Sequence, residues 1–255
     1  MRIPRSHPRY ESLRRRETLV QSWRAGIVVP EGLIAHGRGE AWDYLFGEAT
    51  SAPALVAEKA AAAFLLRAKR PILSVNGNTA ALAAQEVVRL ARRIPAKIEV
   101  NLFHRTEARV RRIERVLRSA GAQELVSGRP DAKIPGLGSQ RAATHRAGIY
   151  QADVVLVPLE DGDRTEALVR MRKTVLTIDL NPLSRTSQKA SVPVVDELSR
   201  ALRNIEKFVG ELRKDSDETT RIIRAYDARR NLRAVFGFLR WRLRDLEAPR
   251  GRARS

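Results

Sequence analysis

Three carboxylates stand within four positions of one another, directly after an apolar run of the sequence. The run is Val154–Pro158, and Glu160, Asp161 and Asp163 follow it. Like charges at this spacing repel one another, so a cation must compensate them. Two cations suit such a site: a Mg²⁺ ion bound together with a nucleotide, or the ammonium group of a substrate. The sequence therefore predicts an active-site turn, with Glu160 and Asp161 as catalytic groups and Asp161 as the metal ligand.

The third acid of this turn has a simpler explanation. Asp163 and Glu166 have the spacing of a capping box, in which an acid caps a helix and a second one reaches back. The residues that follow, 164–172, predict that helix. We therefore assign Asp163 mainly to helix capping.

Polar residues also follow two other apolar runs. Asn78 or Thr79, after the run Pro71–Val75, is suited to cap the next helix, which would leave backbone N–H groups free for an anion. A plain capped turn explains the same residues. His104 and Arg105 follow the run 97–103 and suit a phosphate or a carboxylate, or both stay solvated beside a capping Thr106. The substrate-binding candidates are His36, Asn76, Asn78, His104, Arg105 and Arg164.

A further apolar run, Thr174–Ile178, leads into Asp179 and a loop that holds Arg185 and Thr186. An acid at a strand end can bind a ribose hydroxyl, and hydroxyl and guanidinium groups in the next loop can bind phosphate. An Asn-Pro turn with ordinary capping is the alternative. In the N-terminal part, glycines flank Arg38, which suggests a loop that brings a guanidinium to a ligand.

These candidates need a scaffold that brings strand ends together. Runs such as ADVVLVP (152–158) are almost continuously apolar and rich in β-branched residues, as is typical of strands buried on both faces of a parallel sheet. Strands alternate with helices along the chain. This order predicts an α/β fold: a Rossmann-like, doubly wound, mainly parallel sheet with helical N- and C-terminal extensions. Ligands bind at the carboxyl ends of such strands, where the candidates lie.

We expect one α/β domain over residues 1–255. It comprises a helical N-terminal part (1–67), a Rossmann-like core (71–213) and a C-terminal helix with a basic tail (214–255). Within the first part, the sequence predicts a helix over 8–25, a loop-rich stretch over 26–47 and a helix over 49–67. The last helix, roughly 218–246, is suited to a dimer contact or to packing on the sheet.

The chain is strongly basic, with a formal net charge of +19, and contains no cysteine. The missing cysteines exclude disulfides, zinc–thiolate sites and cysteine nucleophiles. No apolar run approaches the ~20 residues that cross a bilayer, and no secretory signal is found, so we expect a cytoplasmic protein. The charge fits a solvated, salt-bridged surface best, an anionic small ligand next, and nucleic acid last.

Missing motifs narrow the function further. A basic nucleic-acid-binding α/β protein is the alternative function, but aromatic residues make up only 5 % of the chain and no nucleic-acid motif is found. A small-molecule kinase or an NAD-linked enzyme is disfavoured, because neither a Walker A loop nor the dinucleotide fingerprint occurs. GxSxG and HExxH motifs are also missing.

Several blocks of the sequence, taken in order, resemble the archaeal phosphopantothenate synthetases, also called 4-phosphopantoate–β-alanine ligases. The blocks are IPRSHPRYESLRRRE (3–17), GLIAHGRGEAWDYLFGE (32–48), VNGNTAAL (75–82), EVNLFHRTEARVRRI (99–113), KIPGL (133–137), ADVVLVPLEDGDRTEALVRM (152–171) and DLNPLSRTS (179–187). They cover about residues 1–200.

The resemblance implies a Rossmann-like homodimer in coenzyme A biosynthesis that joins 4-phosphopantoate to β-alanine with ATP and releases AMP and diphosphate. Amide synthesis from a carboxylate needs an activated acyl group, which ATP can supply as an acyl-adenylate, with arginines and Mg²⁺ neutralising the phosphates. No side-chain nucleophile is required. By the same resemblance, the nucleotide contacts are Arg16, Arg38, Asp179, Leu180, Asn181, Arg185, Thr186 and Glu197. Glu197 stands where members of this family often have Asn.

Overall fold

The computed structural model describes residues 4–247, and its centre is a six-stranded sheet. The strands, in sheet order, are β3 (Leu125–Val126), β2 (Lys97–Val100), β1 (Pro71–Val75), β6 (Val154–Pro158), β7 (Thr174–Ile178) and β8 (Val192–Val194). Each strand pairs with its neighbours in the parallel direction. The order reverses between β1 and β6, which creates the switch point where such sheets bind ligands. The predicted α/β class with a mainly parallel sheet and helical extensions is confirmed.

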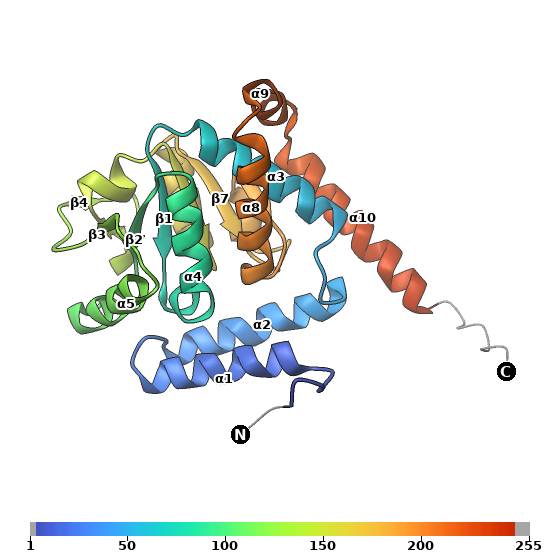
Figure 1. Ribbon diagram of the computed structural model, residues 1–255, viewed down its shortest axis with the longest axis horizontal. Coiled ribbons are helices and arrows are strands. Elements are labelled where there is room, and N and C mark those ends of the chain that lie inside the picture. Colours follow the sequence, from blue (N-terminus) through green and yellow to red (C-terminus); the bar gives the residue numbers. More distant parts are fainter. Residues whose placement is uncertain (1–3, 248–255) are drawn as a thin grey trace.

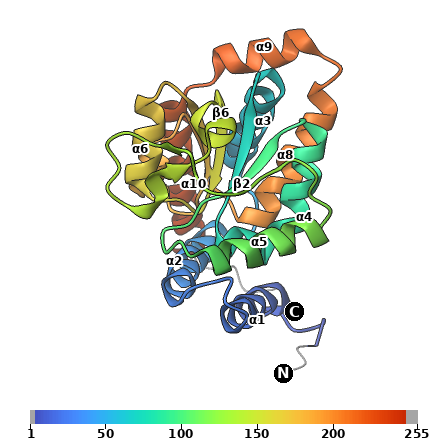
Figure 2. The ribbon, with the colours of Figure 1, turned by 90° about the vertical axis from the view of Figure 1, so that its left-hand side faces the viewer.

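Helices cover both faces of this sheet (Figure 2). One face packs against α3 (Ala52–Arg67), α4 (Gly77–Arg93), α5 (Glu107–Ser119) and α8 (Leu198–Leu212). The other face packs against α6 (Gly162–Arg170) and a short π-helical turn (Arg146–Tyr150).

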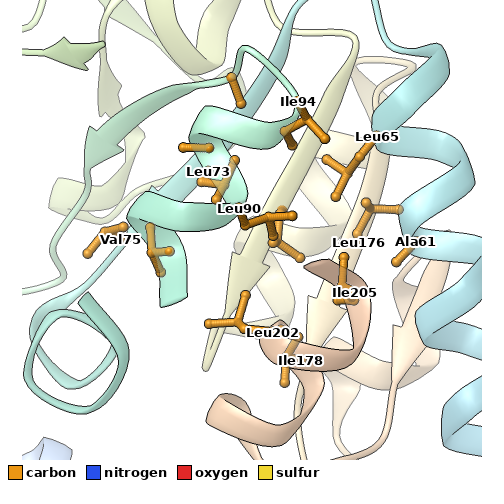
Figure 3. Packing of buried hydrophobic residues seen from close by; sticks show 14 of the residues in the cluster. Ala61, Leu65, Leu73, Val75, Leu90, Ile94, Leu176, Ile178, Leu202 and Ile205 are labelled. Atoms are coloured by element: carbon orange, nitrogen blue, oxygen red, sulfur yellow. The ribbon is translucent and has the colours of Figure 1, made fainter. Parts of the chain in front are cut away.

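Side chains alternate between the two faces along each central strand. In β1, Leu73 and Val75 join the cluster under α4 and α8, whereas Ile72 joins the cluster under α6. Figure 3 shows the first of these clusters, in which Leu90 of α4 and Ile205 of α8 meet the sheet. Burial on both faces explains the nearly continuous apolar runs in the sequence.

Two helices of the N-terminal part precede α3: α1 (Tyr10–Arg24) and α2 (Pro30–Phe46). The predicted loop over 26–47 is therefore wrong for most of its length. Pro30 occupies the first helical position and Gly47 ends the helix in the left-handed conformation, so both boundary signals were present in the sequence. One interior glycine, Gly32, allows close packing, since a Cβ there would lie 2.3 Å from Oδ1 of Asn78.

The C-terminal extension also differs from the prediction of one long helix. It forms α9 (Ser216–Ala225) and α10 (Ala228–Glu247), which meet at an extended residue, Tyr226. The side chain of Asp227 accepts a hydrogen bond from the amide of Arg230 at 2.7 Å, as a helix cap does. Most of the predicted basic tail, residues 248–255, lies outside the described residues. None of the helices between residues 4 and 247 is long and apolar enough to cross a membrane.

The segment between β3 and β6 is mostly irregular but carries a small hairpin. Strands β4 (Ala132–Lys133) and β5 (Ala143–Thr144) pair in the antiparallel direction around a 3₁₀ turn (Gln140–Ala142). Buried Glu99 of β2 holds this segment to the sheet, since it accepts hydrogen bonds from the hydroxyl of Thr144 (2.6 Å) and the amide of Ile149 (2.7 Å). These contacts fix the backbone around Arg141.

Candidate active site

A cleft of about 570 Å³ lies at the carboxyl ends of the central strands. The residues that follow β1, β2, β6 and β7 line it, and α1 and α2 close its other side (Figure 1). Of the residues predicted for the site, the cleft brings together His36, Arg38, Asn76, Asn78, His104, Glu160, Asp161, Asp179, Leu180, Asn181, Arg185, Thr186 and Glu197. Arg16, Arg105 and Arg164 lie outside its lining.

Asn76 joins the ends of β1 and β6. Its Oδ1 accepts hydrogen bonds from the amide and the hydroxyl of Thr79, so Asn76, rather than the predicted Asn78 or Thr79, is the N-cap of α4. Its Nδ2 donates to the carbonyl oxygens of Pro158 (3.0 Å) and Leu159 (2.9 Å). Leu159 has a φ of 52°, a left-handed conformation that is strained for a leucine. Asn76 thus fixes the backbone of Pro158 and Leu159, directly before the acidic turn.

The first acid of that turn is buried between two arginines. The side chain of Glu160 is 2 % exposed, and its Oε1 lies 2.6 Å from Nη1 of Arg141. Its Oε2 pairs with Nη1 of Arg164, which is fully buried and also donates to the hydroxyl of Ser74. Both carboxylate oxygens of Glu160 are therefore occupied. Arg164 lies beneath the cleft and holds Glu160 in place. Contact with a substrate stays a prediction for both residues.

Asp161 is the acid of this turn that lines the cleft and is partly open to solvent. Its side chain is 47 % exposed, and its Oδ2 lies 3.0 Å from Nε of Arg141. Partial burial, together with the nearby charges of Glu160 and Asp163, raises the pKa of Asp161 above its ordinary value, while Arg141 and Arg164 lower it. Asp161 also occupies the N-cap position of α6, so the assignment of that cap to Asp163 is wrong. Asp163 lies in the first turn, where its negative charge interacts favourably with the helix dipole.

The residues after β7 form a second polar group in the cleft. Asp179 accepts hydrogen bonds from the hydroxyl of Ser184 (2.5 Å) and the amide of Asn181 (3.0 Å). Burial raises the pKa of Asp179, although these two hydrogen bonds and the nearby charge of Arg38 oppose that shift. The hydroxyl of Thr186 donates to the carbonyl oxygen of Glu160 at 2.7 Å. This bond ties the loop after β7 to the acidic turn after β6.

The two arginines predicted near the nucleotide differ in their freedom. Arg38 is exposed and makes no ion pair within residues 4–247, so its guanidinium is free to meet a ligand. It lies on helix α2 rather than on the predicted loop. Arg185, at the start of α7 (Arg185–Lys189), is held on the surface by Glu166, 2.5 Å away (Nη2–Oε2).

Glu197 has a clear structural role. Its Oε2 accepts hydrogen bonds from the amides of Ser199 and Arg200, both at 3.0 Å, and so caps α8. The same oxygen lies 3.3 Å from Nη2 of Arg15, another cleft residue. An asparagine could supply the cap but no charge. Arg15 therefore compensates the additional negative charge that Glu197 brings to the cleft.

Arg16 of α1 connects α1 to α2 through an ion pair. Its Nη2 lies 2.6 Å from Oε2 of Glu40 on α2, and Glu40 also accepts a hydrogen bond from Tyr44 at 3.1 Å. The hydrogen bond with Glu40 raises the pKa of Arg16. His36, one turn before Glu40, is partly buried, and burial lowers the pKa of its imidazole. The charge of Glu40 opposes this shift.

The loop after β2 separates its two predicted residues. His104 lines the cleft and is half exposed, with Nε2 3.9 Å from Oε1 of Glu31. Arg105 turns away from the cleft: its amide donates to Oε1 of Gln140 at 2.6 Å, and its Nη1 donates to the carbonyl oxygen of Val100 at 3.4 Å. Thr106 caps α5, as its spacing predicts.

No group of three or more acidic or histidine side chains suited to a metal ion occurs within residues 4–247. Mg²⁺ binds well through one or two carboxylates together with substrate phosphates. The residues present fit that arrangement, because Asp161 is half exposed and only its Oδ2 is paired with Arg141.

Two arginines that line the cleft, Arg109 and Arg141, were not predicted from the sequence. Arg109 and Arg141 are more than nine-tenths buried. In the sequence they resemble the many surface arginines of a basic chain. A threonine cap three residues before Arg109 was the available signal, since it places this arginine in the first turn of a helix near the sheet edge.

Comparison with known proteins agrees with the resemblance found in the sequence. Residues 53–242 match the sequence profile of a family described as phosphopantothenate/pantothenate synthetase. A protein of Methanosarcina mazei is 51 % identical over 250 residues, which are 98 % of each chain. A protein of Methanospirillum hungatei JF-1 is 54 % identical over 94 % of this chain and 98 % of its own. A protein of Thermococcus onnurineus is 50 % identical over 96 % of this chain and 95 % of its own.

Each of these relatives is named 4-phosphopantoate–beta-alanine ligase. The match extends across the sheet, the acidic turn and the loop after β7. On this evidence, the chain belongs to the phosphopantothenate/pantothenate synthetase family.

Proposed function

We propose that this protein is an ATP-dependent ligase that joins 4-phosphopantoate to β-alanine and releases AMP and diphosphate. The observation that carries the proposal is its identity of about half, over almost the whole chain, to relatives named 4-phosphopantoate–beta-alanine ligase. The product, 4′-phosphopantothenate, would serve coenzyme A biosynthesis. The cleft supports the proposal, because its volume of about 570 Å³ and its arginines suit two phosphorylated ligands.

The nucleotide is assigned to the β7 end of the cleft. Asp179 follows β7, at the position where an acid can bind the ribose hydroxyls. Leu180 and Asn181 provide backbone and amide groups beside it, and Arg38 faces this group from α2. Arg38 would neutralise phosphate charge, which is the task that an unpaired guanidinium performs best.

The reaction requires two displacements. A carboxylate oxygen of 4-phosphopantoate attacks the α-phosphorus of ATP, the bond from that phosphorus to the bridging oxygen breaks, and diphosphate leaves. The amine of β-alanine then attacks the acyl carbon, the acyl–oxygen bond breaks, and AMP leaves. The protein must hold the reactants in line, exclude water and stabilise the negative charge that develops.

The acidic turn is assigned to the second displacement and to the metal. Asp161 faces the cleft and would hold either Mg²⁺ or the ammonium group of β-alanine, whose deprotonation must precede attack. Mg²⁺ bound there would neutralise the charge of the phosphate groups. Glu160 would act through Arg141, which it orients toward Asp161 from below.

We further propose that the protein is a homodimer. The described part of α10 leaves Trp241, Leu243 and Leu246 exposed, and burial of such side chains favours association. Sedimentation equilibrium should give the mass of two chains. A species with the mass of one chain at micromolar concentration would reject the dimer.

The activity is tested by incubating the protein with 4-phosphopantoate, β-alanine and Mg-ATP. We expect AMP and 4′-phosphopantothenate in equal amounts, with continued AMP formation only when β-alanine is present. Release of ADP, or steady AMP formation without β-alanine, would reject this mechanism.

A further inference from the structure

Arg109 is a buried cation in the cleft without an acidic partner. It is 9 % exposed, and its Nε and Nη1 donate to the carbonyl oxygens of Ile27 (2.8 Å) and His104 (2.9 Å). No carboxylate oxygen lies within 4.0 Å of its guanidinium in residues 4–247. Two neutral carbonyls do not balance a buried charge, so the position favours an anion.

The other arginines nearby do not share this property. Arg141 is balanced by Glu160 and Asp161, and Arg164 is balanced by Glu160. Burial and the positive charge of Arg141 lower the pKa of Arg109, whereas the charge of Glu31, which also lines the cleft, opposes this shift. Among the described residues of this corner, Arg109 is therefore the buried guanidinium that has no carboxylate in direct contact.

The guanidinium of Arg109 meets the beginning of a long helix. Its Nη2 lies 2.6 Å from the position that a Cβ on Gly77 would take, and Gly77 is the first residue of α4. The first N–H groups of a helix have no acceptor within the helix, and the helix dipole adds positive potential there. Only glycine leaves this approach open, since a Cβ would also lie 2.4 Å from the carbonyl oxygen of Ile27. Gly77 and Arg109 both line the cleft, so a compact anion in the cleft can contact Arg109 and this turn together.

This corner is separate from the nucleotide end of the cleft. Gly77 follows β1 and Asp179 follows β7, and β6 lies between these two strands. Adjacent strands are about 4.8 Å apart, so the two strand ends are separated by about 10 Å. The acidic turn, Leu159–Gly162, follows β6 and so lies between them. A substrate that spans this distance places one end at Arg109 and the other beside the nucleotide.

We propose, on the basis of the ligase function above, that Arg109 and the first turn of α4 bind the phosphate of 4-phosphopantoate. The opposite end of this substrate carries the carboxylate that must reach the α-phosphorus of ATP. Binding by the phosphate orients that carboxylate toward the β7 end. Arg109 is then the residue that distinguishes 4-phosphopantoate from pantoate, which lacks the phosphate.

The test measures equilibrium dissociation constants by calorimetry for 4-phosphopantoate, pantoate and ATP. Arg109→Gln should weaken binding of 4-phosphopantoate about 10- to 100-fold, the range of a lost charge-assisted hydrogen bond. Binding of pantoate and of ATP should stay within about 3-fold of wild type, a change worth less than a hydrogen bond. Arg115→Gln, an exposed arginine on the same helix, is the matched control and should bind all three as wild type does.

A second measurement needs no variant and guards against poor folding of Arg109→Gln. Inorganic phosphate should inhibit the wild-type enzyme in competition with 4-phosphopantoate and not with ATP. Competition with ATP alone, or a loss of ATP affinity in Arg109→Gln, would show that the nucleotide occupies this corner and would overturn the proposal. Unchanged preference for 4-phosphopantoate over pantoate in Arg109→Gln would overturn it too. A wild-type protein that binds 4-phosphopantoate without forming AMP would reject the ligase function and leave the anion site standing.

Discussion

Nη1 of Arg141 lies 2.6 Å from Oε1 of Glu160, and both side chains are buried. Glu160 also pairs with the fully buried Arg164. The carboxylate of Glu160 thus contacts two guanidinium groups beneath the cleft, and Asp161 adds a second carboxylate beside Arg141. Removal of one partner from a buried ion pair is far more costly than loss of a surface pair, because the remaining charge stays buried.

Glu160→Gln should therefore destabilise the fold as well as reduce activity. We expect the free energy of unfolding to fall by about 3–5 kcal/mol, as for other broken buried pairs. Urea denaturation measures this change. Glu211→Gln, which alters an exposed ion pair with Lys207 on α8, is the control and should leave stability almost unchanged. A Glu160→Gln protein that is as stable as wild type but inactive would instead make Glu160 a direct catalytic group.

Arg38→Ala should impair the use of ATP specifically. Arg38 is an exposed cleft arginine without an ion pair in the described chain. Its loss therefore removes a positive charge that would contact the ligand, and breaks no ion pair of the described fold. We expect the KM for ATP to rise about 10-fold or more, in line with hydrogen bonds to charged groups. Steady-state kinetics with each substrate varied in turn provide the measurement. Arg24→Ala, on the exposed surface of α1, is the matched control, and an unchanged KM for ATP in Arg38→Ala would make Arg38 a surface residue only.

Asp161→Asn should alter the dependence on Mg²⁺. Its half-exposed carboxylate lines the cleft, and an amide binds Mg²⁺ more weakly than a carboxylate does. We expect a higher Mg²⁺ concentration for half-maximal activity, with the fold intact. Asp163→Asn makes the same chemical change two residues away and should retain the wild-type Mg²⁺ profile. If Asp161→Asn instead raises only the KM for β-alanine, Asp161 holds the ammonium group and the metal assignment fails.

His145 gives the fold a predictable pH dependence. Nδ1 of His145 lies 3.3 Å from Oε1 of buried Glu99, and this interaction raises the pKa of His145 despite burial and the charge of Arg105. A raised pKa stabilises the folded state below the unfolded value of about 6.5, and this contribution is lost as pH rises through the folded pKa.

The stability advantage of wild type over His145→Gln should accordingly shrink as pH rises above about 6.5. Guanidinium denaturation across pH 5.5–8.5 measures this difference. His7→Gln removes an exposed histidine and should show no such trend. A difference between wild type and His145→Gln that stays constant with pH would contradict the interaction with Glu99.

The sheet was predictable because its strands are buried on both faces. In β6 and β7, Val155 and Val175 face one layer while Leu156 and Leu176 face the other, so apolar residues run without interruption and identify the strands. Polar residues at the strand ends then indicated where ligands bind. Helix α2 was missed because its glycines suggest a loop, whereas the fold uses Gly32 to bring this helix against Asn78.

The charges of the cleft were harder to predict than its location. Glu160 and Asp161 are adjacent in sequence, yet one is buried between arginines and the other is half exposed. Arg141 and Arg109 come from segments far from both acids, and sequence alone does not distinguish a buried arginine from a solvated one in a chain with 48 basic residues. Tertiary contacts decide which charges are balanced, and hence where an anion binds.

The central claim concerns the activation of 4-phosphopantoate by ATP in this cleft. Its most direct test uses 4-phosphopantoate labelled with ¹⁸O in the carboxylate, together with β-alanine and Mg-ATP, and mass spectrometry of the products. An acyl-adenylate transfers one carboxylate oxygen to the α-phosphorus, so the account predicts one ¹⁸O atom in AMP and none in diphosphate. ADP together with ¹⁸O-labelled inorganic phosphate, which an acyl-phosphate would give, would contradict it.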